Sequence, residues 1–170
     1  MNGYIHLYTG NGKGKTTAAL GLTLRALGAG KKVLFCQFLK SGNYCELISL
    51  KKFKEVKIEQ YGRGSFIRHA PEKKDMELAC AGLESVKKAI LARSYPIIIL
   101  DEVNVALKLK LIRLKDLLKV IKWAPKEMEL VLTGRNAHPR VIKSADLVSR
   151  INAVKHYYKQ GQKARKGIEL

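Results

Sequence analysis

A glycine-rich run near the start of the chain carries the residue types that bind phosphate groups. It reads Thr9-Gly10-Asn11-Gly12-Lys13-Gly14-Lys15-Thr16-Thr17. Glycines let successive backbone N–H groups turn toward one anion, a lysine reaches the phosphates, and a hydroxyl can hold Mg²⁺. Lys15 and Thr16 fill the last two positions of the pattern G-x-x-x-x-G-K-[ST], whereas Thr9 stands where that pattern has its first glycine. We therefore expect residues 9–17 to bind the phosphates of a nucleoside triphosphate.

Two carboxylates form the second group that could do chemistry. Asp101 and Glu102 follow directly after the apolar run Ile97-Ile98-Ile99-Leu100. If this run is a strand of a parallel sheet, the carboxylates lie at the edge where ligands of open α/β folds bind. A carboxylate placed there can hold Mg²⁺, directly or through water, opposite the phosphate loop. Together the two motifs predict that the protein binds a nucleoside triphosphate with Mg²⁺.

The segments around these motifs alternate between strand and helix patterns. Strand patterns cover residues 4–8, 32–38, 56–61, 95–100, 129–133 and 147–151, and helical patterns cover residues 17–27, 71–90 and 111–121. This alternation predicts a parallel sheet in a single α/β domain spanning residues 1–170. On the second helix we expect one apolar face, formed by Met76, Ala79, Cys80, Leu83, Val86 and Ile90.

The charge of the chain is strongly positive. Of the 170 residues, 33 are Lys or Arg and 14 are Asp or Glu, which gives a net charge of +19. Such a field attracts polyanions, including nucleotides and nucleic acids. Because the basic residues are spread over nearly the whole sequence, we expect a solvated basic surface and no dedicated nucleic-acid face.

Composition and cysteine usage exclude several classes of protein. A hydrophobic content of 46% excludes a disordered chain, and no apolar run approaches the roughly 20 residues that span a bilayer. The three cysteines, Cys36, Cys45 and Cys80, have no CxxC spacing and are interpreted as reduced thiols packed in the core. We therefore expect a soluble cytoplasmic protein without a membrane partner.

Three further segments of the sequence carry a specific resemblance to a known family. They are Leu100-Asp101-Glu102, Thr133-Gly134-Arg135 with His138, and the closing segment from Val154-Lys155-His156 to Gly167-Ile168-Glu169. With the phosphate loop, they make the chain from Tyr8 to its C-terminus similar to the P-loop type of ATP:corrinoid adenosyltransferases in the cobalamin pathway. The resemblance implies a three-layer P-loop NTPase (RecA-like) fold, with a mostly parallel central sheet and helices on both faces.

The resemblance also implies a transferase reaction. A reduced corrinoid, with cobalt as Co(I), attacks the 5′-carbon of ATP, and inorganic triphosphate leaves intact. ATP lies across the loop in the opposite sense from most P-loop enzymes, so the loop holds a leaving group. The resemblance further implies a homodimer and a flavoprotein that reduces the corrinoid.

Site residues are assigned on this basis. Lys15, Lys13 and the loop N–H groups would stabilise the departing triphosphate, with Mg²⁺ on Thr16 and Glu102. Asp101 would orient these ligands without touching the metal. Arg135 is either a phosphate or ribose contact or part of a salt bridge in its loop.

The corrinoid side of the site depends on one loop. The resemblance implies that Phe66 presses on the lower face of the corrin and helps displace the axial ligand, so we count it with Lys15 and Glu102 as catalytic. Arg68 stands where the family has a tryptophan, so either Phe66 acts alone, Tyr61 helps, or this loop is arranged differently.

Two other functions compete with adenosyl transfer. A nucleic-acid-stimulated P-loop ATPase would account for the net charge of +19. A small-molecule kinase would need an arginine lid, for which the loop with Arg63 and Arg68 is a candidate. The sequence does not select the natural corrinoid, which is either cobalamin or a biosynthetic precursor.

Overall fold

The computed structural model describes residues 2–64 and 71–169, and its centre is a parallel sheet. The strand order is β3-β2-β4-β5-β1-β6, and every pairing is parallel. The strands are β1 (Ile5–Thr9), β2 (Val33–Phe38), β3 (Val56–Tyr61), β4 (Ile97–Asp101), β5 (Glu129–Thr133) and β6 (Leu147–Arg150). The predicted parallel sheet is therefore confirmed, although the bounds of β1, β2, β4 and β6 differ by one or two residues from those expected.

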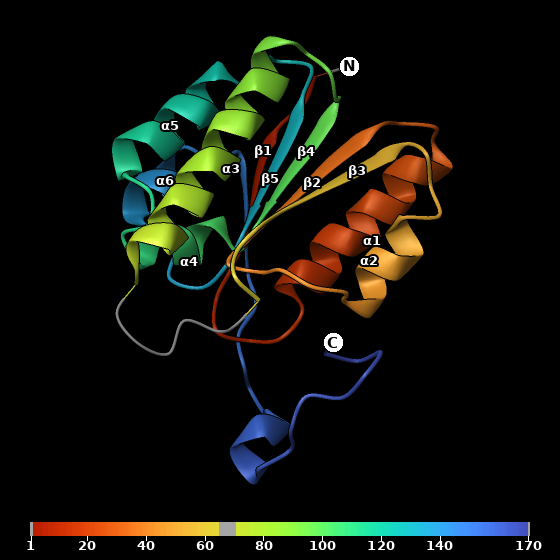
Figure 1. The fold of residues 1–170 in the computed structure, drawn as a ribbon, viewed down its shortest axis with the longest axis vertical. Helices are drawn as coiled ribbons and strands as arrows, with labels where there is room; N and C mark the ends of the chain where they lie inside the picture. The colour runs from red at the N-terminus through yellow and green to blue at the C-terminus, as the bar shows by residue number, and fades with distance from the viewer. Residues whose placement is uncertain (1, 65–70, 170) are drawn as a thin grey trace.

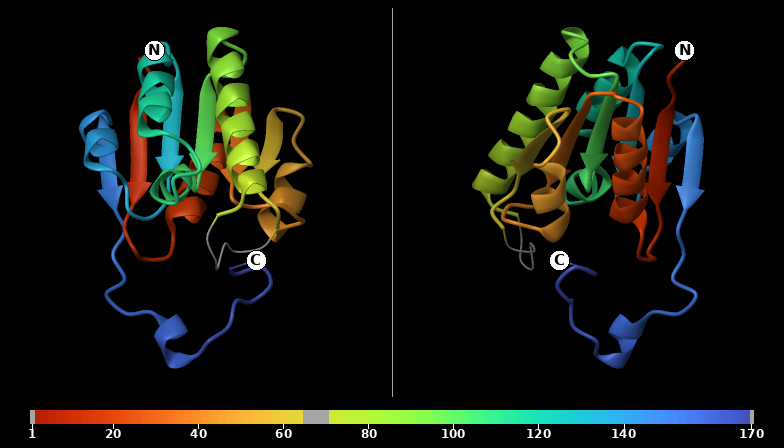
Figure 2. Two further views of the ribbon diagram at one scale, coloured as in Figure 1. Left: turned by 60° about the vertical axis from the view of Figure 1, so that its left-hand side comes forward. Right: turned by 90° about the vertical axis from the view of Figure 1, so that its right-hand side faces the viewer.

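Helices cover both faces of the sheet, so the molecule has three layers (Figure 1). One face carries α1 (Lys15–Gly28) and α2 (Cys45–Leu50). The other face carries α3 (Lys73–Leu91), α4 (Val103–Lys108), α5 (Leu114–Trp123) and α6 (Pro139–Lys143). After β6 the chain continues below the sheet through a short 3-10 helix, η1 (Tyr157–Gln160), as Figure 2 shows. The predicted α/β fold with helices on both faces is confirmed.

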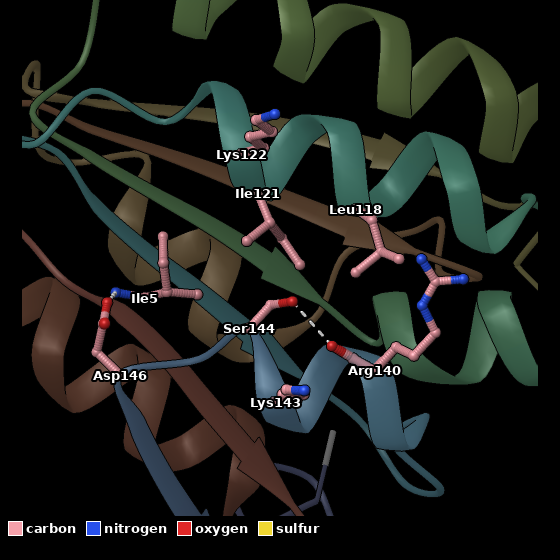
Figure 3. A pocket seen from close by; sticks show the side chains of 8 residues that line it. All are labelled: Ile5, Leu118, Ile121, Lys122, Arg140, Lys143, Ser144 and Asp146. Atoms are coloured by element: carbon pink, nitrogen blue, oxygen red, sulfur yellow. Dashed lines mark hydrogen bonds between the residues drawn. The ribbon is translucent and has the colours of Figure 1, made fainter.

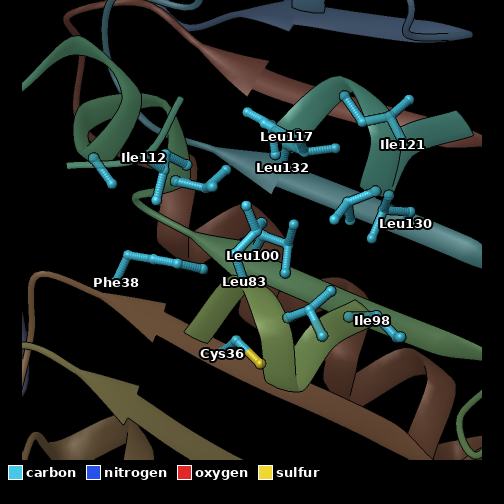
Figure 4. Packing of buried hydrophobic residues seen from close by; sticks show 14 of the residues in the cluster. Cys36, Phe38, Leu83, Ile98, Leu100, Ile112, Leu117, Ile121, Leu130 and Leu132 are labelled. Carbon is cyan, nitrogen blue, oxygen red and sulfur yellow. The ribbon is translucent and has the colours of Figure 1, made fainter. Parts of the chain in front are cut away.

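The central strands are buried on both sides, as expected for strands of a covered parallel sheet. Successive side chains of a strand point to opposite faces, so Leu34, Cys36 and Phe38 pack with α3, α4 and α5 (Figure 4). Val33 and Phe35, from the same strand, pack with α1 on the opposite face. The two cores fix the sheet between the helical layers and so fix the edge at which the strands end.

The helix expected from residue 71 differs in two respects. It begins at Lys73, because Glu72 and Asp75 form a reciprocal capping box at its start. The expected apolar face is also narrower, since Met76 is 41% exposed and Cys80 is exposed. Met76 lies in the first turn, at the end of the stripe, so the core contacts come from the later turns. Met76 therefore lies outside the buried face. Of the three cysteines interpreted as core residues, Cys36 is buried, whereas Cys45 is half-buried and Cys80 is exposed.

Three short helices were not expected from the sequence: α2, α4 and α6. The helix expected at residues 111–121 begins at Leu114, and Leu111 packs into the core from the turn before it. Nowhere in residues 2–64 or 71–169 is a helix both long enough and apolar enough to cross a membrane.

Candidate functional site: the phosphate loop and the Asp101 centre

The phosphate loop connects β1 to α1 and packs against the backbone that follows β6. Gly10 has φ of 101°, and a Cβ at this position would lie 2.3 Å from the carbonyl oxygen of Ile151. The N–H of Gly12 donates to the same carbonyl at 2.8 Å. Glycine is needed here because the loop lies against another backbone with no room for a side chain.

The contacts of Thr9 explain why this position does not have the usual glycine. Its side chain is buried, and its hydroxyl donates to the carbonyl of Gly134 at 2.9 Å. The N–H of Ala137 donates back to the Thr9 hydroxyl at 3.4 Å. Thr9 therefore fastens the start of the phosphate loop to the segment that follows β5, which a glycine could not do.

Lys15 is held inside the loop. It is the first residue of α1, with Gly14 in the left-handed conformation before it, and its ammonium donates to the Gly12 carbonyl at 2.6 Å. Burial lowers the pKa of Lys15, while the negative charge of Glu102 acts in the opposite direction. The first N–H groups of α1 have no acceptor within the helix, so their dipoles and the Lys15 charge favour an anion at the loop. Thr17 lies in this first turn.

Asp101, at the end of β4, is a fully buried carboxylate with four side-chain donors. One of its oxygens accepts from the hydroxyls of Thr16 at 2.8 Å and Thr133 at 2.7 Å. The other accepts from the Lys40 ammonium at 2.8 Å and from the Gln37 amide at 3.5 Å. Burial opposes the charge of Lys40, but the neighbouring Asp101 carboxylate outweighs it and raises the pKa of Lys40. These side chains come from different parts of the sheet edge and fix one another.

Glu102 follows in a constrained backbone conformation. Its φ is 61°, in the left-handed region that costs a non-glycine residue free energy, and its N–H donates to the Thr133 hydroxyl at 3.0 Å. Burial, and then the negative charge of Asp101, raise the pKa of the Glu102 carboxyl. A cation beside Glu102 would relieve both effects.

The residues around Thr16 fit a Mg²⁺ ion. Thr16 donates its hydroxyl proton to Asp101, which leaves the lone pairs of its oxygen available to a metal. Asp101 is already neutralised by Lys40, whereas Glu102 has no such cation within an ion-pair distance among the described residues. Protein Mg²⁺ sites commonly use one or two carboxylates with substrate phosphates. Residues 2–64 and 71–169 contain no group of three or more His, Cys, Asp or Glu that could hold a metal ion.

Arg135 lies on the loop after β5, beside the phosphate loop. It is exposed, and within the described part of the chain it forms no ion pair, so the salt-bridge alternative has no support there. It borders a cleft of about 520 Å³ whose lining residues are Thr9, Gly10, Asn11, Arg135, Asn136, Ala137, Ile142, Arg150 and Asn152. Arg135 is therefore placed to contact a ligand that enters this cleft.

A second cavity, of about 460 Å³, lies between α5, α6 and the start of β1 (Figure 3). It is lined by Ile5, Leu118, Ile121, Lys122, Arg140, Lys143, Ser144 and Asp146. The Ser144 hydroxyl donates to the Arg140 carbonyl at 2.8 Å within α6. The cavity shares no residue with the phosphate loop and is not part of the nucleotide site.

Lys13, the additional cation of the loop, contacts the end of the chain. Its ammonium donates to the Tyr157 hydroxyl at 2.8 Å and to the Glu169 carboxylate at 2.7 Å. The sequence offered the block containing these partners only as part of a resemblance and did not predict the contact. Lys40 was also missed. Thr133 was named only within a family block, without a role, and its place at the end of a predicted strand was the signal for one.

The structure thus brings nearly all of the predicted site together. The loop residues 9–17 meet Asp101 through Thr16, and Arg135 borders the same loop. Phe66 and Arg68 lie outside the described residues, so the corrin contact stays a prediction. Tyr61 ends β3, where its hydroxyl donates to Glu59 at 2.5 Å.

His138 has a structural contact. Its Nδ1 accepts from the backbone N–H of Arg140 at 3.1 Å and caps α6.

Comparison with known proteins gives a consistent result. The model of the family described as ATP:corrinoid adenosyltransferase BtuR/CobO/CobP matches residues 1–170. The corrinoid adenosyltransferase of Pseudomonas aeruginosa is 35% identical over 170 residues, covering 99% of this chain and 84% of that protein. The corrinoid adenosyltransferase of Escherichia coli strain K12 is 33% identical over 168 residues (98% and 85%). Corrinoid adenosyltransferase CobA of Salmonella typhimurium is 32% identical over 168 residues (98% and 85%).

Two solved structures with a similar fold are much less similar in sequence. The KaiC-like protein PH0186 of Pyrococcus horikoshii has a TM-score of 0.58 at 13% identity, over 89% of this chain and 72% of that one. The flagellar accessory protein FlaH of Methanocaldococcus jannaschii has a TM-score of 0.58 at 14% identity, over 88% and 71%. At this identity the likeness concerns the fold alone, which is the RecA-like α/β fold expected from the sequence.

Proposed function

The chain belongs to the ATP:corrinoid adenosyltransferase family, and from this premise we propose how its residues transfer the adenosyl group of ATP to a corrinoid. The Co(I) centre of the reduced corrinoid substrate attacks the 5′-carbon of ATP. A cobalt–carbon bond forms as the carbon–oxygen bond to the triphosphate breaks, and the electron pair of the broken bond stays on the triphosphate. The protein has to align these groups and to stabilise the charge on the leaving group.

The phosphate loop binds the triphosphate as that leaving group. The observation that carries this proposal is the buried Lys15 ammonium, enclosed by a glycine loop at the start of α1. Lys15, the N–H groups of residues 10–17 and Lys13 oppose the negative charge that grows on the bridging oxygen. Arg135 contacts the phosphates or the ribose from the neighbouring cleft.

Thr16 and Glu102 would hold Mg²⁺ beside the phosphates of ATP, and Asp101 orients Thr16. An ion held there would supply positive charge against the charge of the triphosphate. Support comes from the Thr16 hydroxyl, which donates to Asp101, and from Lys40, which neutralises Asp101. Lys15 and Glu102, with Phe66 on the corrinoid side, are the proposed catalytic residues.

Several broader properties are also proposed. A single six-stranded sheet with helices on both faces supports one nucleotide-binding domain over residues 1–170. The homodimer, the flavoprotein reductant and the cytoplasmic location rest on the family resemblance and on the composition of the chain. Each remains a prediction.

Product analysis tests the proposal directly. The protein is mixed with ATP, Mg²⁺ and chemically reduced cobalamin, and the products are separated by chromatography. We expect adenosylcobalamin and inorganic triphosphate. ADP and phosphate as the main products would contradict the leaving-group role and favour an ATPase or a kinase.

A matched pair of lysine variants tests the loop. Lys15→Met is expected to lower turnover by about a hundredfold or more, since it removes a cation aimed at the developing charge. Lys32→Met, at an exposed position before β2, removes the same charge and is expected to turn over at the original rate. Equal losses in the two variants would contradict a specific role for Lys15.

A further inference from the structure

The end of the chain returns to the phosphate loop after leaving the sheet. Figures 1 and 2 show this segment descending from β6, passing through η1 and coming back beneath the loop. Val154, where the segment leaves, is 98% exposed, so the path is not dictated by burial. Side chains of the loop hold this segment: Asn11 accepts from the N–H of Ala153 at 3.2 Å, and Lys13 bonds to residues further along.

Lys13 belongs to a cluster of four side chains, called the Lys13 cluster: Lys13, Tyr157, Arg165 and Glu169. Lys13 donates to Tyr157 and Glu169, and the Tyr157 hydroxyl donates to the same Glu169 oxygen. Arg165 holds Glu169 with its backbone N–H at 2.8 Å and its guanidinium at 3.1 Å. Both cations also lie over the Tyr157 ring, 5.5 Å and 5.0 Å from its centre. Each member is thus held by at least two others.

The charge of the cluster is favourable for an anion. Lys13 and Arg165 contribute two positive charges and Glu169 one negative charge, so the cluster keeps a net positive charge at the loop. A simple Lys13–Glu169 pair would be neutral, so the net positive charge depends on Arg165. Hydrogen bonds from Arg165 and Lys13 lower the pKa of Glu169, and those from Lys13 raise its own pKa, so both groups stay charged at neutral pH.

The hydrogen bonds of the cluster position the Lys13 side chain before a ligand binds. A lysine ammonium has three N–H donors, and two of those of Lys13 are used by Glu169 and Tyr157. The side chain therefore has its rotamer freedom restricted before any ligand arrives, which lessens the entropy lost on binding. The third donor remains for a phosphate oxygen.

From these contacts we infer that residues 152–169 complete the triphosphate site, with Tyr157 and Glu169 as positioning residues for Lys13 and Arg165 keeping the cluster cationic. This inference rests on the proposed role of the loop in holding triphosphate. It adds that the far end of the chain sets the affinity for the leaving group.

Calorimetry with inorganic triphosphate and Mg²⁺ tests the inference without the corrinoid reaction. Glu169→Gln is expected to weaken triphosphate binding by about three- to tenfold. The Lys13 side chain, no longer held by Glu169, then loses its rotamer freedom only when triphosphate binds. Tyr157→Phe should have a smaller effect in the same direction. Glu127→Gln, an exposed carboxylate on the loop before β5, makes the same change of net charge and should leave the affinity unchanged.

A double variant separates positioning from a merely structural role. In a Lys13→Met background, Glu169→Gln should have no further effect, because there is no ammonium left to position. In steady-state adenosylation, Glu169→Gln should lower kcat/KM for ATP by at least the factor by which it weakens triphosphate binding, since Lys13 also opposes the charge that grows as the bond breaks.

The possible outcomes distinguish this inference from the proposed function. If Lys13→Met leaves triphosphate affinity unchanged, the loop role of Lys13 fails as well. If Lys13→Met weakens binding and Glu169→Gln does not, only the positioning role is overturned. Tighter binding by Glu169→Gln would also overturn it, because Glu169 would then compete with the phosphates for Lys13.

Discussion

Two clusters of charged side chains flank the phosphate loop, and they differ in burial. At the Asp101 centre, Asp101 is fully buried and receives donors from Thr16, Thr133 and Lys40. In the Lys13 cluster, the side chains of Lys13 and Arg165 are 36% and 47% exposed. We therefore expect the hydrogen bonds and ion pairs of the Asp101 centre to fix the shape of the site, and those of the Lys13 cluster to adjust its charge.

The difference follows from the cost of removing charge from water. A buried carboxylate that loses its partner leaves an uncompensated charge, which strongly destabilises the fold. An exposed pair is solvated whether or not it forms, and salt screens it further. Substitutions should therefore affect stability at the Asp101 centre and ligand affinity in the Lys13 cluster.

The largest expected effect is on the buried carboxylate. Asp101→Asn should lower the free energy of unfolding by about 3 kcal/mol or more, because it removes the countercharge of the largely buried Lys40. Urea denaturation followed by circular dichroism measures this change. Adding Lys40→Met to Asp101→Asn should restore part of the stability, since the unpaired cation is then gone. A loss below about 1 kcal/mol would mean that the centre behaves like an exposed pair.

An intermediate effect is expected at the start of α3. Asp75 caps the helix and accepts two bonds from Arg63, at 2.8 Å and 2.9 Å. Asp75→Asn should cost about 1–2 kcal/mol of stability at pH 7, as the loss of a cap and a charged hydrogen bond.

The stability lost in Asp75→Asn should depend on pH in one direction. The Arg63 bonds lower the pKa of Asp75 below its usual 3.8. The stabilisation is therefore fully present above about pH 3.8 and is lost as the pH falls through the lower native value. Urea midpoints of the two proteins should converge toward acid pH. A constant difference down to the acid limit would rule out the ionic contribution.

The smallest effect on stability is expected in the Lys13 cluster. Glu169→Gln should leave the urea midpoint unchanged within experimental error, because its partners are exposed and solvated. Together with weaker triphosphate binding by the same variant, an unchanged urea midpoint would show that Glu169 acts on ligand affinity and not on folding. A clear drop in the midpoint would make the cluster structural and remove the contrast with the Asp101 centre.

The sequence predicted those parts of the site that depend on local pattern. The glycine spacing around Lys15 and the apolar run before Asp101 each require only neighbouring residues. Strand and helix alternation then placed both motifs at one edge of a parallel sheet. That placement is confirmed by the Thr16–Asp101 hydrogen bond, which joins residues 85 positions apart.

The missed contacts depend on tertiary distance. Lys13 and Glu169 are 156 positions apart, and no periodic pattern predicts that the end of the chain returns to its first loop. Lys40 resembled one more surface lysine because its partner is buried on another strand. Thr9 looked like a departure from the pattern until its bond to Gly134 supplied the reason. The short helices α2 and α4 have too few turns to show a periodicity.

The close approach of Gly10 to Ile151 has a consequence for synthesis of the protein. The loop near the beginning of the chain lies against a backbone carbonyl that is translated about 140 residues later. A nascent chain therefore lacks one wall of its nucleotide cradle until β6 has been made and has docked beside β1. Competence to hold ATP is therefore among the last properties that this polypeptide acquires as it is made and folds.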